Sequence, residues 1–497
     1  MDKEETRRSW RVGADMGNHE ESKNMNKMAM AMAVSAVILC ACAGNAQAAA
    51  DNVTIDFSHD TGPVRPVNGV GQPPVVGYDN FSLIRHLKEA GIPYSRLHDV
   101  GGAFGKNIFV DIPNLFRDFD ADENDPKNYD FAFTDLLINA LVENGVEPYF
   151  RLGVTIENAC NVKAYRIHPP KDAAKWARIC EHVVAHYTEG WADGFRHKIT
   201  YWEIWNEPDN NVENQNPGRP FRNLNWWGTF DEYLDLYEVA SKHLKRRFPQ
   251  IKVGGYASCG FYATTRPKDK WRDWGSDVGH YVVCFDKFLE RVKSRDCPVD
   301  FFSFHSYADV PTTARHVDYA KRRLREAGLG GAELHVNEWL PHHSMANLGT
   351  AFQAAEVAAM LAVFQEHGVD VGCIYDARWG LGEYAPLFNP LTREPYKALQ
   401  SFKAFKALRD MGTSVKCAAG GGLYATAATD GKGRGAVLVS NIDRKNAKRL
   451  ECDFGGWKVR EWRVLDATRD LEPTRSLANV PPSTVLLAIV EKDAESR

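Results

Sequence analysis

Short apolar runs alternate with longer amphipathic stretches along most of the chain. Between residues 65 and 411, runs rich in Val, Ile, Tyr and Phe are each followed by a stretch in which apolar residues recur every three or four positions. The first pattern is typical of buried strands and the second of helices packed on one face. The predicted strands lie at 67–72, 94–100, 147–154, 199–208, 252–260, 301–307, 333–339 and 371–379.

Helical patterns fill the intervals between these runs. Two of them begin after prolines, at Pro170 and at Pro395, and several end at glycine, as helices commonly do. The other helical patterns fall near 79–90, 132–144, 231–247, 281–294, 312–327 and 350–367. Eight strand–helix units over this length predict an α/β fold, a (β/α)8 TIM barrel at 65–411. A doubly wound sheet is the competing fold, but its Gly-rich phosphate turn after an early strand is missing from the sequence.

The pattern changes after about residue 411. Residues 412–497 contain short alternating runs separated by Gly, Asp and Asn, which predict antiparallel strands in a small C-terminal β-sandwich. Residues 51–64, which precede the barrel, contain a similar run and are predicted to add an N-terminal strand to the same sandwich.

The N-terminus has the pattern of a targeting segment. Residues 25–50 combine Lys27, an apolar run and small residues, with Ala46-Gln47-Ala48 as a cleavage site, and residues 1–24 form a polar leader. These features predict a signal peptide and export to the periplasm or the medium. The alternative is an outer-membrane lipoprotein anchored at Cys42, because the preceding residues resemble a lipoprotein box. The apolar run is shorter than a typical membrane span, and no other candidate span is found.

Composition excludes several classes of partner. The 497 residues carry a formal net charge of −4, which favours neither nucleic acid nor an anionic membrane as a partner. The ten cysteines show no CxxC and no zinc spacing, and Cys417 and Cys452 remain a possible pair. The acidic stretch 120–125 lacks the Gly of a calcium loop, and the adjacent histidines at 342–343 are not a typical metal site. We therefore predict neither a metal nor a cofactor.

Two glutamates occupy matching positions in the predicted barrel. Glu207 ends the fourth strand and Glu338 ends the seventh; each follows an Asn and lies among aromatic residues. The working end of such a barrel is formed by the C-terminal ends of its strands. Cleavage of a glycoside requires two carboxyl groups, one as proton donor and one as nucleophile or base. An apolar setting raises the pKa of a carboxyl so that it keeps its proton near neutral pH.

These segments resemble a known family. WNEP at 205–208 and NEW at 337–339 resemble the retaining hydrolases of clan A. Together with 129–153, 168–177 and 300–307, they make residues 65–410 similar to glycoside hydrolase family 39, which holds β-xylosidases and α-L-iduronidases. The resemblance implies that Glu207 is the acid/base, that Glu338 is the nucleophile and that Asn206 binds the sugar 2-hydroxyl.

The chain departs from the family pattern in places. Asp209 stands where family members often carry Asn, and Asn337 stands where many carry Thr. The segment 96–102 also differs from the FHG common in the xylosidases. These departures leave the mechanism unchanged but leave the sugar specificity open.

Several further residues are candidate sugar ligands. His305 and Tyr307 alternate on one strand and should share a face, where Tyr307 is placed to bond the nucleophile and His305 a sugar hydroxyl; the alternative is that both fill the barrel core. His98 is a candidate ligand on the second strand, and Arg96 on the same face is predicted to be the buried partner of a carboxylate.

The eighth strand adds two candidates. Trp379 is a possible stacking floor for the sugar ring. Arg378 suits a uronic acid, because a guanidinium pairs with carboxylates, unless it pairs with Asp376 beside it. Trp226 and Trp227, in the long loop after the fourth strand, either border the cleft or pack the loop down.

The sequence thus predicts an exported, retaining exo-glycosidase acting on fragments of plant or host polysaccharides. A β-xyloside is the first expected substrate, with α-L-arabinosides, β-galactosides and α-L-iduronides as alternatives. The expected separation of the carboxyl groups is about 5–5.5 Å, whereas about 6.5–9.5 Å is typical of inverting enzymes. A glycan-binding barrel without activity and a transglycosylase remain open, as does the oligomeric state.

Overall fold

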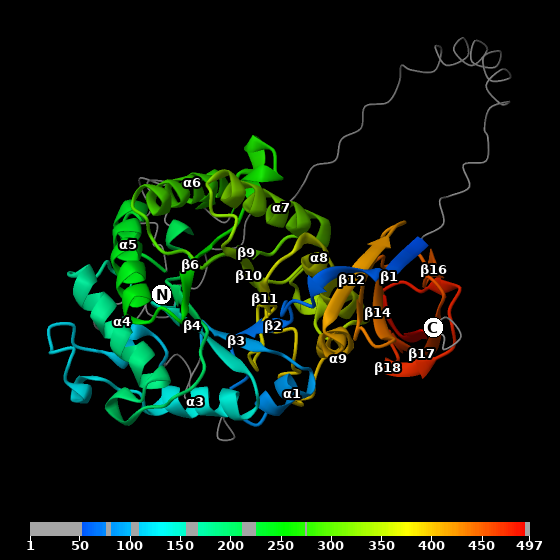
Figure 1. Cartoon of the computed structure of the whole chain (residues 1–497), viewed down its shortest axis with the longest axis horizontal. Helices are drawn as coiled ribbons and strands as arrows, with labels where there is room; N and C mark the ends of the chain where they lie inside the picture. Colours follow the sequence, from blue (N-terminus) through cyan, green and yellow to red (C-terminus); the bar gives the residue numbers. More distant parts are fainter. Residues whose placement is uncertain are drawn as a thin grey trace, which may run out of the picture. The chain divides into compact units, whose positions relative to one another are not determined.

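Eight parallel strands form a closed barrel (Figure 1). Its strands, in order around the barrel, are β2 (Gly69–Gly71), β3 (Tyr94–Leu97), β4 (Glu147–Leu152), β5 (Tyr201–Ile204), β6 (Lys252–Ser258), β9 (Phe301–Ser306), β10 (Glu333–Trp339) and β11 (Val371–Ile374). Each of the eight predicted strands overlaps one of these, so the predicted (β/α)8 barrel is confirmed. The computed structural model describes residues 52–75, 81–100, 109–155, 167–210, 225–273 and 276–492. The predicted leader, the signal peptide and Cys42 lie outside these residues.

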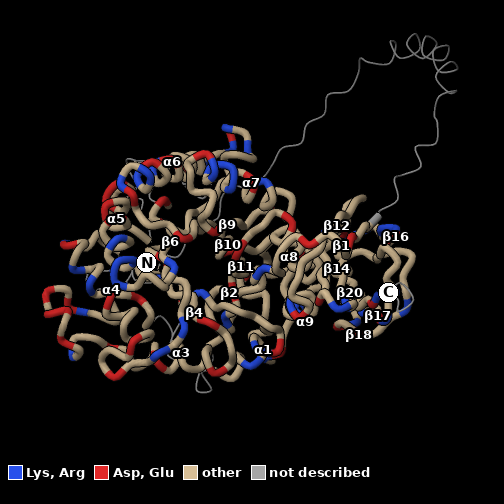
Figure 2. The backbone as a smooth tube through the Cα atoms, viewed as in Figure 1, with Lys and Arg blue, Asp and Glu red and all other residues tan. Residues whose placement is uncertain are grey.

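Helices surround the strands. They are α1 (Ile84–Glu89), α2 (Ile112–Leu115), α3 (Ala132–Glu143), α4 (Ala173–Thr188), α5 (Phe230–Arg247), α6 (Val278–Ser294), α7 (Val310–Glu326), α8 (Ala351–His367) and α9 (Lys397–Met411). Helix α5 shows how local sequence sets such an element: Thr229 and Glu232 form a complete capping box at its start. Acidic and basic positions are mixed along this ring of helices (Figure 2). None of the helices in the described ranges is both long and apolar enough to cross a membrane.

The short helical turns and a small hairpin lie in the connections. They are η2 (Pro126–Asn128), η4 (Trp191–Asp193), η5 (Pro208–Asn210), η6 (Tyr262–Thr264), η7 (Lys268–Lys270), η8 (Met345–Asn347), β7 (Arg272–Asp273) and β8 (Ser276–Asp277). Two of these turns, η5 and η6, follow the C-terminal ends of β5 and β6, and they therefore belong to the end of the barrel where Glu207 lies.

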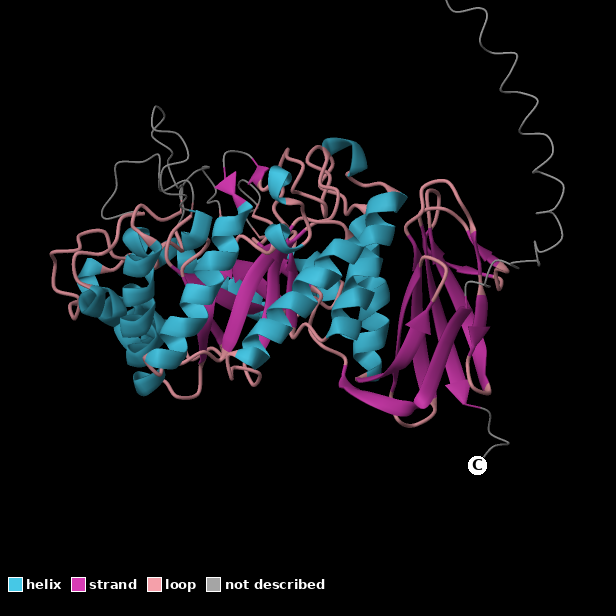
Figure 3. Cartoon of the chain, turned by 90° about the horizontal axis from the view of Figure 1, so that it is seen from above, coloured by secondary structure: helices cyan, strands magenta, loops and turns pink. Residues whose placement is uncertain are grey.

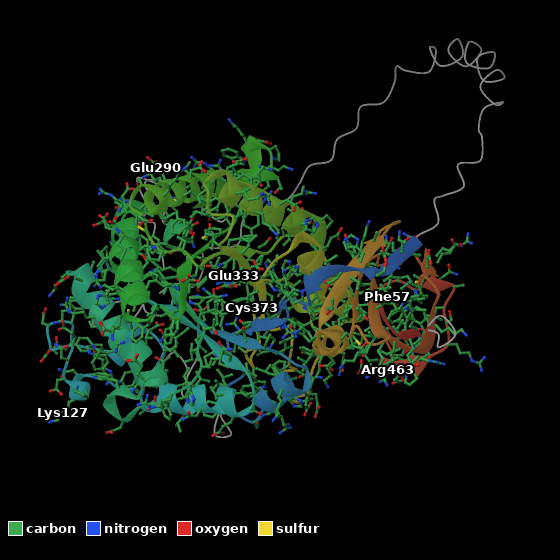
Figure 4. The ribbon with its side chains drawn as sticks, in the orientation of Figure 1. Phe57, Lys127, Glu290, Glu333, Cys373 and Arg463 are labelled. Atoms are coloured by element: carbon green, nitrogen blue, oxygen red, sulfur yellow. The ribbon has the colours of Figure 1, made fainter. Side chains whose placement is uncertain are left out.

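The barrel interior is packed with side chains below its working end. Tyr149, Tyr201, Phe301, Val371 and Cys373 form one cluster inside the strands, and Cys373 is labelled in Figure 4. A filled barrel of this kind is a core rather than a pore. Residues at the C-terminal strand ends therefore stand on a rigid floor.

The C-terminal region is a sheet of antiparallel pairs with one parallel pair, and residues that precede the barrel contribute a strand to it. Its strands, in spatial order, are β16 (Glu451–Asp453), β1 (Asn52–Pro63), β12 (Thr413–Ala419), β13 (Leu423–Thr429), β14 (Arg434–Asn441), β20 (Thr484–Lys492), β17 (Trp457–Leu465) and β18 (Asp470–Thr474). A small ladder of β15 (Lys448–Arg449) and β19 (Asn479–Val480) lies beside it. The strand-rich region and the added N-terminal strand were both predicted. Cys417 and Cys452 lie on the two strands that flank β1 and are not bonded to each other.

Alternate residues of this sheet serve two different cores. Leu438 and Leu487 belong to the core of the barrel and its helices, whereas Val439 and Leu486 belong to a second core within the sheet region. Helix α8 packs against the sheet, and the Ser440 hydroxyl donates to the Ala355 carbonyl at 2.7 Å. Figure 3 shows helices standing between the barrel strands and this sheet. Because α8 is covered on both sides, it is buried without interruption from Gln353 to Gln365.

Candidate active site

The backbone is unusual where Glu207 leaves the barrel. Trp205 and Glu207 have φ angles of 73° and 44°, in the left-handed region that residues other than glycine seldom adopt. Such conformations cost free energy and persist where the surroundings enforce them, often at functional sites. Here the Glu207 amide donates to the Ala257 carbonyl at 3.1 Å, which ties the turn after β5 to the end of β6.

Glu338 and His305 lie side by side on β10 and β9, where they are direct register partners. The ladder between these strands shifts register between Val336 and Glu338. An irregularity of this kind at the end of a strand redirects a side chain. Gly260 closes the neighbouring turn with a φ of +114°, and a Cβ there would lie 2.5 Å from the His305 carbonyl oxygen.

The two predicted catalytic carboxyls face each other. One oxygen of Glu207, one oxygen of Glu338 and one ring nitrogen of His305 all lie within 4.8 Å of one another. Carboxylate and imidazole donors in this arrangement could also hold a divalent transition metal. The same atoms are those that a glycosidase uses for proton transfer and nucleophilic attack.

Glu338 has a charged partner. Arg96 Nη1 donates to its Oε1 at 2.8 Å, and the Tyr307 hydroxyl donates to its Oε2 at 2.7 Å. Its side chain is 6% exposed and that of Arg96 is fully buried. The predicted contact from Tyr307 and the predicted pairing of Arg96 with a carboxylate are both present. The guanidinium compensates the negative charge of Glu338 in a site that water hardly reaches.

Arg96 is itself fixed from below by a second carboxylate. Its Nε donates to Glu203 at 2.8 Å, and its Nη2 donates to the Asn206 side-chain oxygen at 2.6 Å. Glu203 is fully buried and also accepts hydrogen bonds from Ser303 at 2.6 Å and from Asn337 at 2.5 Å. The bond from Arg96 fixes the orientation of the Asn206 amide, so its NH2 group remains the donor for another partner.

Glu207 has neutral partners. Its Oε1 lies 2.7 Å from Nδ1 of His305, and its Oε2 accepts from the side-chain amides of Asn225 at 3.2 Å and Asn210 at 3.4 Å. No Lys or Arg of the described ranges forms an ion pair with it. Burial raises the pKa of Glu207 to about 7, although 19% of its side chain remains exposed. Burial also lowers the pKa of His305 to about 4, so the ring is neutral around pH 7.

His98 lies at the same end of the barrel. It is 3% exposed, its Nε2 lies 3.8 Å from Glu338, and burial lowers its pKa well below the usual value. Its Nδ1 has no hydrogen-bond partner among the described residues. A neutral imidazole with an unused nitrogen can accept or donate to a sugar hydroxyl.

The eighth strand end differs from its neighbours. Arg378 forms an ion pair with Asp376, at 3.0 Å between Nε and Oδ2, and its backbone amide donates to the same carboxyl at 3.0 Å. The alternative of a local pair is therefore the arrangement that the structure shows. Trp379 is partly buried, and the guanidinium of Arg393 lies 5.5 Å from the centroid of its ring.

The other residues that the sequence analysis considered lie outside the contacts of Glu207 and Glu338 described above. Trp226 is buried and donates from its indole to the Thr229 carbonyl, whereas Trp227 is 48% exposed and lies beside His168. In the acidic stretch, Asp122 caps the amide of Asn124. His342 forms an ion pair with Glu356, a buried residue of α8.

Two residues that support the predicted catalytic pair, one through Arg96 and one directly, were not singled out from the sequence. Glu203 is the anchor of Arg96, and a charge in the middle of an aromatic strand was the available signal. Asn225 bonds Glu207 from a position 18 residues further along the chain. It follows a long loop, and no periodicity connects it to the site.

Comparisons with known proteins give the family of the chain. The family model described as glycosyl hydrolases family 39 matches residues 81–331, half of the chain. A beta-xylosidase from Geobacillus stearothermophilus is 24% identical over 288 residues, which cover 52% of this chain and 50% of the relative. The chain thus matches about half the length of that curated relative.

Solved structures share the fold. A glucosidase from Croceicoccus marinus superposes with a TM-score of 0.68 at 20% identity, over 90% of this chain and all of the other. A monomeric beta-xylosidase from Caulobacter crescentus superposes with a TM-score of 0.62 at 16% identity, over 90% of this chain and all of the other. At these identities the likeness concerns the fold, while the family model covers the strands that carry Glu207 and His305. The chain belongs to glycosyl hydrolase family 39.

Proposed function

We propose that the protein is a retaining exo-glycosidase that hydrolyses β-xylosides by double displacement. One observation carries the proposal: two carboxyls from matching strand ends face each other within 4.8 Å, one beside a cation and the other with a raised pKa. A closest approach of two carboxyl oxygens within 4.8 Å supports the ~5–5.5 Å carboxyl separation of retaining enzymes over the ~6.5–9.5 Å of inverting ones.

In the first step, Glu338 attacks the anomeric carbon while Glu207 gives its proton to the leaving oxygen. A bond forms between this carbon and a Glu338 oxygen, and the glycosidic bond breaks as the leaving group departs as an alcohol. The raised pKa of Glu207, about 7, leaves it protonated over most of the acidic range. Arg96 and Tyr307 hold Glu338 in place for the attack.

In the second step, Glu207, now ionised, takes a proton from water while the water oxygen attacks the anomeric carbon. The bond to Glu338 breaks, the carboxylate is restored beside Arg96, and Glu207 is protonated again. Two inversions at one carbon give net retention. Asn206, oriented by Arg96, is proposed to donate to the sugar 2-hydroxyl.

The choice of a neutral pentose rests on two supports. The curated relative is a beta-xylosidase, and Arg378, which would suit a uronic acid, already pairs with Asp376. The charge of Arg378 is thus compensated inside the protein, and a second carboxylate from a substrate would gain less from it. A β-glucoside remains a competitor because the Croceicoccus marinus neighbour is a glucosidase.

The test is hydrolysis of aryl β-xyloside, α-arabinoside, β-galactoside, β-glucoside and α-iduronide by the wild type and by Glu338→Gln. The matched control is Glu333→Gln, on the same strand but at its opposite end; Glu333 is labelled in Figure 4. We expect turnover of one sugar, with retention seen by NMR of the first product, loss in Glu338→Gln and preservation in Glu333→Gln. Inversion would contradict the mechanism. If no sugar of the panel is hydrolysed and the protein still binds a glycan, a barrel that binds glycans without cleaving them would be favoured.

We also propose export, from the pattern of residues 25–50. Expression of the full chain in a Gram-negative host and N-terminal sequencing of the mature protein test it. A start at Ala49 supports a cleaved signal peptide, a lipid-blocked Cys42 supports the lipoprotein alternative, and an uncleaved cytoplasmic protein contradicts both.

A further inference from the structure

Consecutive residues at the end of β9 carry partners of both predicted catalytic carboxyls. The ring of His305 lies 2.7 Å from Glu207, and the hydroxyl of Tyr307 donates to Glu338 at 2.7 Å. These two side chains alternate along the strand end and face the site, whereas Ser306 between them contacts the helix α7 outside the barrel. The position of this one strand end therefore decides where both contacts fall.

The backbone of Tyr307 is bound by a side chain from the connection after β6. The Tyr307 amide donates to the hydroxyl of Tyr262, the first residue of the turn η6, at 2.9 Å. The Tyr262 ring is itself enclosed: the His316 ring meets it edge-on with 5.3 Å between centroids, and the Arg266 guanidinium lies 4.7 Å from its centroid. The accepting hydroxyl therefore has a defined position.

Ser306 is held on the outer side of the strand by a buried polar chain. Its hydroxyl lies 2.8 Å from the Thr313 hydroxyl and 3.1 Å from Nδ1 of His316, both on α7. Nε2 of His316 lies 3.0 Å from the hydroxyl of Thr265, which belongs to the same connection as Tyr262. Burial lowers the pKa of His316 to about 3, so its ring is neutral, and one nitrogen donates while the other accepts.

The backbone of His305 is packed against the same connection. Gly260 has a φ of +114°, which glycine adopts readily, and a Cβ there would lie 2.5 Å from the His305 carbonyl oxygen. Residues 260–265, which we call the β6 clamp, thus contact His305 and Tyr307 directly and Ser306 through His316.

The end of β6 also holds the turn that carries Glu207. The Glu207 amide donates to the Ala257 carbonyl at 3.1 Å. The carboxyl of Asp209, two residues further on, accepts from the Ser258 hydroxyl at 2.6 Å and from the Cys259 amide at 3.2 Å. One stretch of chain therefore binds the backbone on both sides of the site.

We propose that the β6 clamp fixes the partners of the two carboxyls relative to each other, and that Tyr262 is the positioning residue that keeps the Tyr307 hydroxyl on Glu338. Without the Tyr262 hydroxyl, the Tyr307 amide loses its acceptor and the strand end is free to shift. Glu338 would then lose one of the two groups that orient it for attack, and small displacements of reacting groups are costly. This proposal rests on the proposed role of Glu338 as the nucleophile.

The test is a double-mutant cycle of Tyr262→Phe and Tyr307→Phe on the aryl glycoside that the wild type cleaves best. Tyr262→Phe keeps the ring and removes only the hydroxyl. We expect it to lower kcat about tenfold with KM within about twofold of the wild type. The double variant should be no slower than Tyr307→Phe, because Tyr262 acts through the Tyr307 hydroxyl. Losses that multiply, or an unchanged kcat in Tyr262→Phe, overturn the proposal.

Tyr237→Phe is the matched control for the loss of a tyrosine hydroxyl. Tyr237 is a buried residue of α5 whose hydroxyl donates to the Pro298 carbonyl at 3.0 Å, outside the contacts of Glu207 and Glu338. Its replacement should lower the melting temperature and leave kcat unchanged. An equal fall of kcat in Tyr237→Phe and Tyr262→Phe would show a general loosening of the fold and overturn the specific role of Tyr262.

A second readout needs no substrate. NMR of the full chain, isotope-labelled at the tyrosine Cζ atoms, reports the hydrogen bond of each hydroxyl, and the signal that is missing in Tyr307→Phe belongs to Tyr307. We expect this signal to move in Tyr262→Phe and to stay in place in Tyr237→Phe. A signal that does not move in Tyr262→Phe overturns the inference. If no glycoside is cleaved, the proposed function fails while this signal still decides whether Tyr262 positions Tyr307.

Discussion

The ends of β5 and β10 place the same pair of residues, Asn followed by Glu, in opposite electrostatic surroundings. Glu338 receives a guanidinium at 2.8 Å and a phenol at 2.7 Å. Glu207 receives a neutral imidazole at 2.7 Å and two amides. Glu338 is also the less exposed of the two, at 6% against 19%. Burial alone therefore does not separate the two roles; the presence or absence of a cation does.

The cation reaches only one of them because of where its strand lies. Arg96 stands on β3 and extends across the floor of the site, where Glu203 fixes it from below. The fully buried ion pair with Glu203 gives Arg96 one position, from which Nη1 meets Glu338 and Nη2 meets Asn206. One anchored guanidinium thus positions the proposed nucleophile and the proposed ligand of the 2-hydroxyl together.

Replacement of Glu338, the glutamate paired with Arg96, should have the largest effect on activity. Glu338→Gln keeps the shape but cannot form the glycosyl-enzyme bond, so we expect kcat to fall at least about 10⁴-fold. Steady-state kinetics checks this, with the melting temperature as the control for folding. A fall below about tenfold would mean that Glu338 is not the nucleophile.

The effect of replacing Glu207, the glutamate with neutral partners, should depend on the leaving group of the substrate. In Glu207→Gln we expect kcat/KM to fall about 10²–10⁴-fold for alkyl or oligosaccharide leaving groups, because they need a proton. For a dinitrophenyl glycoside, whose leaving group departs as an anion, the first step should be nearly unaffected. Pre-steady-state bursts on both substrates test this, and equal losses on the two would argue against an acid role.

Arg96, whose charge lies beside Glu338 and not beside Glu207, should also contribute to the stability of the fold. Arg96→Met leaves Glu203 as an uncompensated buried charge, which we expect to cost about 3–5 kcal/mol in the free energy of unfolding. Arg117→Met removes the exposed pair with Asp130 and should cost no more than about 1 kcal/mol. Urea unfolding of both variants checks this. A similar loss in the free energy of unfolding for the two would show that the ion pair between Arg96 and Glu203 does not stabilise the fold.

The raised pKa of Glu207 predicts a smaller effect, on the pH dependence of stability. The folded protein binds the Glu207 proton more tightly than the unfolded chain does, since the pKa rises from 4.5 to about 7 on folding. This group therefore lowers the free energy of unfolding as pH rises from about 4.5 to about 7, by at most about 3 kcal/mol.

Glu207→Gln removes that dependence. The variant should be more stable than the wild type at pH 8, and its advantage should disappear at pH 4, where the wild-type carboxyl is protonated. Urea unfolding at the two pH values measures it. An advantage that is the same at both would mean that folding does not raise the pKa of Glu207.

Much of this arrangement could be read from the sequence, and the rest has physical reasons for being hidden. The eight strands could be predicted because each is a short apolar run that ends in polar residues. Glu207 and Glu338 could be predicted as site residues because both follow an Asn at such an end. Glu203 was overlooked because an inward-facing charge breaks the apolar pattern that defines a strand. Its partner, Arg96, is distant in sequence.

The sequence could not predict which of the two glutamates is paired with a cation, for a different reason. Both glutamates lie in similar aromatic segments, and which one receives Arg96 depends on the relative positions of β3, β5 and β10 in the closed barrel. In the same way, the apolar pattern of α8 predicted a helix, but its burial on both sides follows from the sheet that packs over it. Such features come from packing between distant elements.

The division of labour between the two glutamates is tested most directly by azide rescue of Glu338→Ala and Glu207→Ala on an activated aryl glycoside, with NMR of the glycosyl azides formed. Azide should replace the missing nucleophile in Glu338→Ala and give the product of inverted configuration. In Glu207→Ala it should attack the glycosyl-enzyme and give the product of retained configuration. The opposite assignment of configurations would exchange the two roles, and inverted products from both variants would contradict a covalent intermediate on either residue.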